Sequence, residues 1–189
     1  MRIFLAIDLN PPIRSGISAI QDSLAREGIR GIRWVNPGGV HLTLHFCGEI
    51  SGETAERLSG ALAPGVPVPP FSVGIGGLGT FPPRGAPRVL FVAAREADSL
   101  ARVAGWVEER VALAGLPREA RPFRPHLTLG RFRAGARPLD RDILEASFAR
   151  DLGMLPVDRV VMFRSHLEPG GARYEALHTF PLLGPAGEP

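Results

Sequence analysis

The feature that most constrains this chain is a tetrapeptide, His-Leu-Thr-Leu, that occurs twice, at residues 41–44 and 126–129. Each copy follows a segment with apolar residues at helical spacing, and these segments end at Gly28 and Gly115. Nearly the same number of residues separates glycine from histidine in both copies. The pattern predicts a duplicated chain in which two related lobes face each other and share one cleft.

Each motif is expected to be a strand with two different faces. Because side chains alternate along a strand, His41 lies beside Thr43, and His126 beside Thr128, while the leucines point into the core. A single pair of this kind is typical of a packed or solvated strand face. Two identical pairs at the same place in a repeated unit favour a functional role.

The residue types of the two motifs suit acid–base chemistry on an anionic substrate. Imidazole has an ordinary pKa near 6.5, so one histidine can accept a proton while the other donates one, each contributing about 10²- to 10⁴-fold. The hydroxyls of Thr43 and Thr128 can donate to developing oxyanions, and Arg131, five residues after His126, is the candidate arginine. Strict alternation would turn Arg131 toward the leucine side unless the strand ends or bulges at Gly130.

Short strands and helices account for the rest of the chain, which we expect to form one functional unit over residues 1–189. A Pro-Gly-Gly run at 169–171 predicts a hairpin between the last two strands. Strands are predicted over 2–8, 40–46, 71–75, 89–94, 126–129, 157–166 and 174–180, and helices from a cap at residue 10 to residue 28 and over 53–62, 99–114 and 139–149.

The composition excludes several mechanisms. All 22 basic residues are arginines, so no lysine can bind nucleotide phosphates, form a Schiff base or carry a nucleotidyl group. A lone Cys47 excludes an internal disulfide and a zinc site of several cysteines. The N-terminal apolar run is too short for a signal peptide, and no stretch reaches the roughly 20 apolar residues of a membrane span, so we expect a cytoplasmic protein.

The chain resembles the 2H phosphoesterases, a family named for two His-x-Thr-x motifs. Within this family it is most similar to the RNA 2′,3′-cyclic phosphodiesterases, also known as 2′-5′ RNA ligases. The segments that carry the resemblance are MRIFLAIDL at the start, RWVNPGGVHLTLHFCGE and FRPHLTLGR around the two motifs, and RYEALHTFPL near the end.

The resemblance implies a bilobal α+β fold with two antiparallel sheets flanking a central cleft, helices on the outer faces and no metal or other cofactor. It implies hydrolysis of RNA 2′,3′-cyclic phosphate ends to 2′-phosphates, with ligation as the reverse reaction. The family's catalytic histidines correspond to His41 and His126, and its phosphate-binding residues to Thr43, Thr128 and Arg131. By analogy, His41 is assigned to the leaving oxygen and His126 to the water.

Other side chains near the motifs carry weaker signals. A metal site of His41 and His45 is unfavourable, because an i, i+4 pair along a strand is roughly 13 Å apart at about 3.3 Å per residue. We expect His45 at the cleft edge or paired with a neighbour. Candidate contacts to a base or to the RNA backbone, each also explained by ordinary packing or solvation, are Trp34, Phe46, Phe123 and Arg124.

Two other functions stay open from the sequence. The chain can be a non-catalytic nucleotide-binding module, although such a module predicts a damaged motif and both motifs are intact. It can also act on the cyclic phosphate of a small nucleotide, which a panel of substrates would separate from RNA. We expect RNA or such a nucleotide as the partner, with no membrane and no obligatory protein partner.

Overall fold

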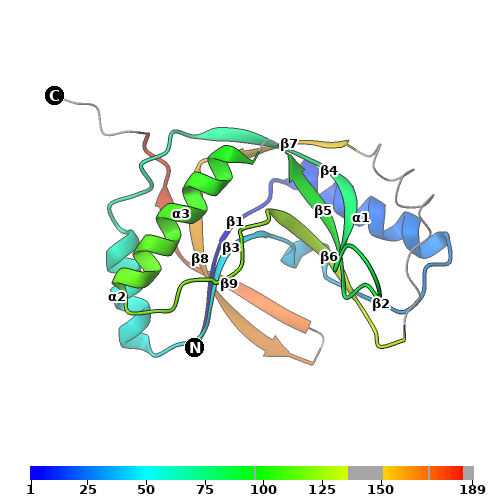
Figure 1. Ribbon diagram of the computed structural model, residues 1–189, viewed down its shortest axis with the longest axis horizontal. Coiled ribbons are helices and arrows are strands. Elements are labelled where there is room, and N and C mark those ends of the chain that lie inside the picture. The colour runs from blue at the N-terminus through cyan, green and yellow to red at the C-terminus, as the bar shows by residue number, and fades with distance from the viewer. Residues whose placement is uncertain (96, 136–150, 170, 185–189) are drawn as a thin grey trace.

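The computed structural model describes residues 1–95, 97–135, 151–169 and 171–184. A strongly curved antiparallel sheet occupies the middle of the molecule, with α2 and α3 together on one side and α1 on the other (Figure 1). The strands are β1 (Arg2–Ile7), β2 (Ile32–Trp34), β3 (Leu42–Glu49), β4 (Phe71–Phe81), β5 (Val89–Arg95), β6 (His126–Phe132), β7 (Asp151–Val157), β8 (Arg159–Glu168) and β9 (Gly171–Pro181). The helices are α1 (Pro11–Arg26), α2 (Gly52–Leu62) and α3 (Asp98–Leu113), and a 3-10 turn, η1 (Pro37–Gly39), precedes β3.

The described strands form one sheet, in the order β7-β4-β5-β6-β3-β1-β8-β9, with β2 paired to β6. Its two halves join at the centre, where Leu42 of β3 pairs with Leu127 of β6. The α+β class with antiparallel strands is confirmed. The prediction of two separate sheets is wrong, because the two motif strands pair with each other and make the sheet continuous.

Helix α1 forms where the sequence pattern predicts it. The Asn10 side chain caps the helix by accepting a hydrogen bond from the Ile13 amide at 3.3 Å, and Gly28 follows its end with a positive φ of 79°. Its buried stripe consists of Ile13, Ile17, Ile20, Gln21 and Leu24. The helix contacts β7, where Leu152 packs against Gly16 so closely that an added Cβ would lie 2.7 Å from a leucine methyl group.

The other two helices pack against each other, and α3 also contacts β3. Ser51 caps α2 by accepting a hydrogen bond from the Thr54 amide at 3.1 Å. The apolar stripe predicted for the third helix is buried, since Leu100, Val103 and Val107 have no exposed surface. The contact with α3 holds β3 on the face that is turned away from the candidate active site.

The leucines of both motifs lie in the core, as predicted. Leu42, Leu127 and Leu129 have no exposed surface, and Leu44 is 5% exposed. These buried anchors hold the backbone of the two central strands, and therefore the direction of the polar side chains between them.

Two strands were not predicted, and several are longer than predicted. Residues 32–34, for which the sequence predicts no strand, form β2, and residues 151–157 form β7 at the edge of the sheet. Strand β3 begins one residue after His41, while β4 continues to Phe81 rather than ending at Ile75. The predicted helix over 139–149 lies outside the described residues.

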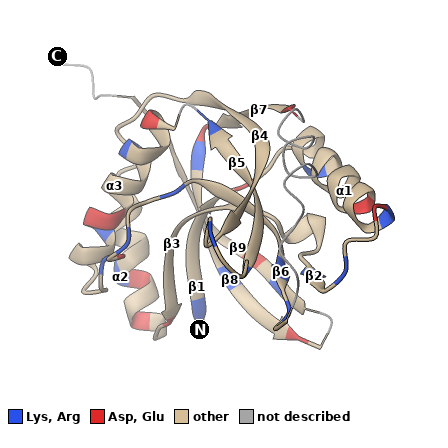
Figure 2. Ribbon diagram, turned by 45° about the vertical axis from the view of Figure 1, so that its right-hand side comes forward, with Lys and Arg blue, Asp and Glu red and all other residues tan. Residues whose placement is uncertain are grey.

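Charged residues of both signs lie on helices and on strands. Helices α2 and α3 carry both acidic residues and arginines (Figure 2). Arginines also occur on strands of the central sheet, among them Arg2 and Arg131. Among the described residues, no helix is both long and apolar enough to cross a membrane.

Candidate active site

His41 lies immediately before β3, in a pocket of aromatic rings. Its ring stacks on Phe4 with centroids 4.5 Å apart and meets Tyr174 edge-on at 5.1 Å. Its Nδ1 donates a hydrogen bond to the Gly39 carbonyl at 2.8 Å. Contacts from β1, β9 and the η1 turn therefore hold this imidazole in one orientation.

His126 begins β6 and is held in the same way. Its Nδ1 donates to the carbonyl of Arg124 at 2.6 Å, again two residues upstream. The rings of Phe81 and Phe91 meet it edge-on at 5.0 and 5.4 Å. The repeat seen in the sequence thus extends to the hydrogen bond that orients each histidine.

These hydrogen bonds determine which nitrogen of each ring can react. A carbonyl oxygen only accepts, so Nδ1 carries the hydrogen in both histidines. In the neutral ring Nε2 is then an unprotonated acceptor, and in the charged ring it is a donor. Each histidine can therefore take or give a proton through Nε2 without losing the bond that positions it.

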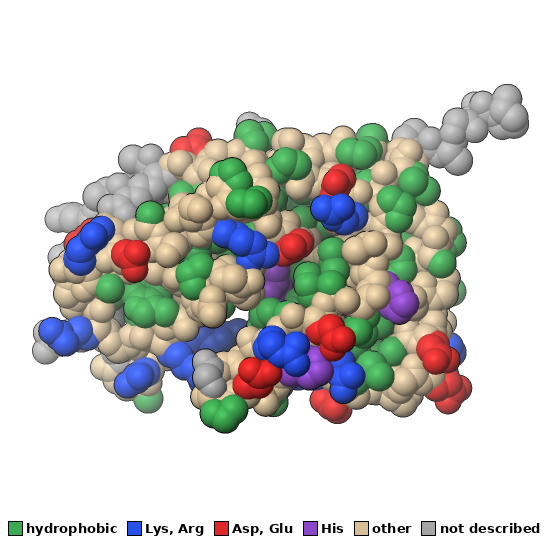
Figure 3. Space-filling view, turned by 180° about the vertical axis from the view of Figure 1, so that it is seen from behind, with side chains coloured by type: hydrophobic (Ala, Val, Ile, Leu, Met, Phe, Trp, Pro, Cys, Tyr) green, Lys and Arg blue, Asp and Glu red, His purple; other side chains and the backbone are tan. Residues whose placement is uncertain are grey.

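Residues of both motifs line one cavity of about 230 Å³. It brings together His41, Thr43, Thr128 and Arg131, which were predicted as site residues. His126 is not among the lining residues; it lies two positions before Thr128 on the same strand, and its charge acts on His41. Figure 3 shows this face hollowed near its centre, with a histidine at the hollow and arginines along its edge.

A β-bulge follows the threonine in each motif strand. In β3 the register against β1 shifts between His45 and Thr43, and in β6 the register against β5 shifts between Gly130 and Thr128. Each shift inserts one extra residue, the second leucine of the motif, so the alternation of faces changes there. A bulge at this point is the condition under which Arg131 leaves the leucine side of the strand. Arg131 lines the cavity, and so does Phe46, the residue at the same position in the first motif.

The bulge in β3 also corrects the place expected for His45. Strict alternation along the strand would put His45 on the face of His41, but the residue is buried, 5% exposed, and paired with Glu108 of α3. The extra residue in the strand turns His45 toward the helix and Phe46 toward the cavity. Pairing with a neighbour was one of the two alternatives stated for His45, and it is confirmed.

The loop that precedes His41 is held by an arginine. Arg14 of α1 donates to the carbonyls of Pro37 at 3.1 Å and Gly38 at 2.7 Å, and its guanidinium also binds the carboxylate of Asp8. These contacts fix the segment whose Gly39 carbonyl orients His41. The sequence reasoning did not single out Arg14 or Asp8.

Burial lowers the pKa of both histidines below the ordinary value of 6.5. At His41 the bond to the Gly39 carbonyl and the charge of Asp8 oppose this shift, whereas Arg14 and His126 add to it. At His126 the bond to the Arg124 carbonyl opposes the lowered pKa, and the charge of Arg131 adds to it. The free site therefore favours neutral imidazoles, and an anion in the cavity would favour a protonated one.

The remaining predicted contact residues lie in different places. Phe46 lines the cavity and is 51% exposed, with the Arg2 guanidinium 5.0 Å from the centre of its ring. Trp34 and Phe123 are partly buried against the core and do not line the cavity. Arg124 is exposed and contributes its backbone carbonyl to His126.

Sequence reasoning missed the wall of the cavity built by distant strands. Phe4 of β1, Ser165 of β8 and Tyr174 of β9 line it together with the first motif. Tyr174 is the only tyrosine of the chain, and it lies in a segment that carried the resemblance, which was the available signal. Within the described residues, no three His, Cys, Asp or Glu side chains group as a set of metal ligands.

Comparisons with known proteins identify the family of this chain. A family model described as the 2′-5′ RNA ligase superfamily matches residues 13–168. The chain belongs to this superfamily. A relative from Archaeoglobus fulgidus, named RNA 2′,3′-cyclic phosphodiesterase, is 33% identical over 180 residues, which cover 95% of this chain and 99% of the relative. The family resemblance and the enzyme class predicted from the sequence are confirmed at this level.

Two solved structures share the fold of this chain. The structure of TT0787 from Thermus thermophilus has a TM-score of 0.79 and 30% identity, covering 97% of this chain and 99% of that one. The structure of E. coli LigT complexed with 3′-AMP has a TM-score of 0.77 and 26% identity, covering 96% and 97% of the two chains. The arrangement of strands and helices is therefore shared with these two proteins.

Proposed function

We propose that this protein hydrolyses 2′,3′-cyclic phosphates at RNA ends to 2′-phosphates without a metal ion. The observation that carries the proposal is the repeated orientation of His41 and His126, each with Nδ1 bound to a carbonyl and Nε2 left for proton transfer. The substrate class is supported by relatives named RNA 2′,3′-cyclic phosphodiesterase and by a related protein crystallised with a nucleotide.

The two histidines take opposite protonation states in the reaction. Neutral His126 accepts a proton from water through Nε2 while the water oxygen bonds to phosphorus. The bond from phosphorus to the ribose 3′ oxygen breaks, and protonated His41 gives its Nε2 proton to that oxygen. The product carries a 2′-phosphate and a 3′-hydroxyl, and the pair of histidines has exchanged one proton, which solvent restores.

Charge on the phosphorane oxygens is met by the other motif residues. The hydroxyls of Thr43 and Thr128 donate to these oxygens, and Arg131 adds a positive charge from the same wall of the cavity. Phe46, exposed at the cavity and equivalent to Arg131, is placed to stack on the terminal base. Ligation uses the same ring opening with the 5′-hydroxyl of a second RNA in place of water: that oxygen bonds to phosphorus, the bond to the ribose 3′ oxygen breaks, and a 2′-5′ linkage forms. Water is far more concentrated than RNA ends, so hydrolysis dominates in dilute solution.

We also propose that the two halves of the sheet arose by duplication. The order strand, helix, motif strand is β1, α1, β3 in one half and β5, α3, β6 in the other. The equivalent residues Leu42 and Leu127 pair at the centre, and both motif strands bulge at the second leucine. A local two-fold relation of this kind would relate His41 to His126 across the centre of the sheet.

The test is hydrolysis of a short RNA ending in a 2′,3′-cyclic phosphate, with EDTA present, by wild type, His41→Ala, His126→Ala and His178→Ala. His178 is an exposed histidine of β9 and serves as the matched control. We expect a 2′-phosphate by ³¹P NMR, a loss of about 10²- to 10⁴-fold in each motif variant and normal activity in the control. Absence of turnover by folded wild-type protein, or a 3′-phosphate product, would overturn the proposal.

A further inference from the structure

Two arginines lie directly opposite each other on neighbouring strands, and one of them, Arg131, lines the cavity. Arg33 of β2 pairs in register with Arg131 of β6. Directly opposed residues of an antiparallel pair share one face of the sheet, with Cβ atoms about 4.5–5.5 Å apart. Their side chains therefore leave the sheet on the same side.

The neighbours of Arg33 show which side this is. Ile32 and Trp34 flank it on β2 and turn toward Gly130, where an added Cβ would lie 2.5 Å from an Ile32 methyl carbon and 3.2 Å from the Trp34 ring. Ile32 is 9% exposed, and Trp34 packs against the core. Arg33 must point the other way, to the face on which Arg131 lines the cavity.

No carboxylate of the described residues pairs with either arginine, although several other arginines have such a partner. The paired ones are Arg14 with Asp8, Arg57 with Glu53, Arg95 with Asp151, Arg121 with Glu119, Arg159 with Asp158 and Arg173 with Glu168. Like charges directly opposite each other on a sheet are destabilising. An anionic ligand that bridges the two guanidinium groups would remove that cost.

We propose that Arg33 binds the phosphodiester group on the 5′ side of the terminal nucleotide while Arg131 binds the reacting cyclic phosphate. The inference rests on the proposed function and deepens it, since it makes an RNA end a better substrate than a nucleoside 2′,3′-cyclic phosphate. A nucleoside cyclic phosphate has one phosphate and leaves Arg33 without a ligand. A dinucleotide that ends in a cyclic phosphate carries the second phosphate as a phosphodiester and can reach both arginines.

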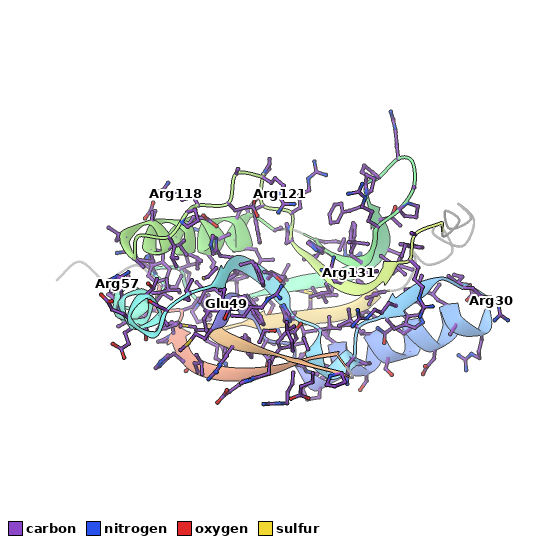
Figure 4. The ribbon with its side chains drawn as sticks, turned by 90° about the horizontal axis from the view of Figure 1, so that it is seen from below. Arg30, Glu49, Arg57, Arg118, Arg121 and Arg131 are labelled. Atoms are coloured by element: carbon purple, nitrogen blue, oxygen red, sulfur yellow. The ribbon has the colours of Figure 1, made fainter. Side chains whose placement is uncertain are left out.

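The test compares these two substrates in wild type, Arg33→Ala and Arg30→Ala. Arg30 is an exposed arginine at the outer end of the molecule, away from Arg131 (Figure 4). Its removal changes the net charge of the protein by the same amount as removal of Arg33. For Arg33→Ala we expect kcat/KM on the dinucleotide to fall by roughly 3- to 10-fold, mainly through KM, and kcat/KM on the mononucleotide to stay at the wild-type value. Arg30→Ala should match wild type on both substrates.

Salt dependence gives a second measurement. Each phosphate contact to single-stranded nucleic acid contributes a slope of about −0.7 in a plot of log affinity against log salt. The slope for the dinucleotide should become shallower by about that amount in Arg33→Ala, and the slope for the mononucleotide should not change.

The outcomes separate this inference from the proposed function. Equal losses on both substrates, or none on either, with turnover intact would overturn the role of Arg33 and leave the proposed reaction standing. No turnover of either substrate by wild type would overturn the proposed function itself.

Discussion

Adding one methyl group at Gly130 should disturb both the sheet and the site. Gly130 lies at the bulge that turns Arg131 toward the cavity, with β2 passing close beside it. In Gly130→Ala the new Cβ would lie 2.5 Å from an Ile32 methyl carbon, 3.1 Å from the Arg33 carbonyl oxygen and 3.2 Å from the Trp34 ring. The backbone oxygen and the stiff β-branched side chain cannot move aside freely, so β2 and β6 must separate.

Overpacking of this kind costs about 1–3 kcal/mol of the free energy of unfolding. For a chain of this length each kcal/mol corresponds to about 2–4 °C, so Tm should fall by roughly 2–12 °C. A shift of about 1 Å in the position of Arg131 would lower kcat/KM by up to about 100-fold. Thermal unfolding followed by circular dichroism, and cyclic phosphate hydrolysis well below Tm, measure the two effects.

Gly105→Ala is the matched control, because it adds the same methyl group elsewhere. Gly105 lies in the interior of α3, and nothing lies within 4 Å of an added Cβ. Alanine is the better helix former by about 0.8–1 kcal/mol, so this variant should be more stable than wild type and equally active. Equal Tm and activity in Gly130→Ala and wild type would refute the close approach of β2 to the bulge.

Two further predictions concern the titration of the histidines. Burial lowers the pKa of His41 and His126 in the folded protein, so the unfolded chain binds more protons between the folded pKa and 6.5. Tm should therefore fall as pH is lowered through that window. His41→Ala should make Tm depend less steeply on pH. An equally steep dependence in the variant would contradict the lowered pKa of His41. Asp8 raises and Arg14 lowers the pKa of His41, so Asp8→Asn should lower that pKa and Arg14→Gln should raise it. NMR titration of the His41 ring, with His126 as internal reference, checks the two signs, and shifts in the same direction would count against direct electrostatic action.

Regular elements with strong local patterns were predictable from the sequence. The helix α1 carried its apolar stripe, its Asn10 cap and its terminal glycine within one segment, and each is present in the structure. Strand β2 has three residues and no pattern of its own, since it exists by pairing with β6. Strand β7 contains Gly153 and Pro156, which weaken the usual strand signal, and it is held by pairing with β4.

The part of the site that lies in the two motifs was predictable from the sequence. The part that is built by strands distant in the sequence was not. The spacing of histidine and threonine predicted one face for each pair, and the cavity contains His41, Thr43 and Thr128. Bulges depend on pairing with neighbouring strands, so the sequence left the direction of Arg131 open. For the same reason Tyr174, which reaches the site from the last strand, was not singled out.

The division of roles between the two histidines is the central claim, and a substrate with sulfur in place of the ribose 3′ oxygen tests it most directly. A thiolate leaves without a proton, so this 2′,3′-cyclic phosphorothiolate needs the base but not the acid. His41→Ala should recover most of the wild-type rate on the sulfur substrate, whereas His126→Ala should stay as slow as it is on the oxygen substrate. Equal recovery in both variants, recovery in neither, or recovery in His126→Ala alone would contradict His41 as the acid and His126 as the base.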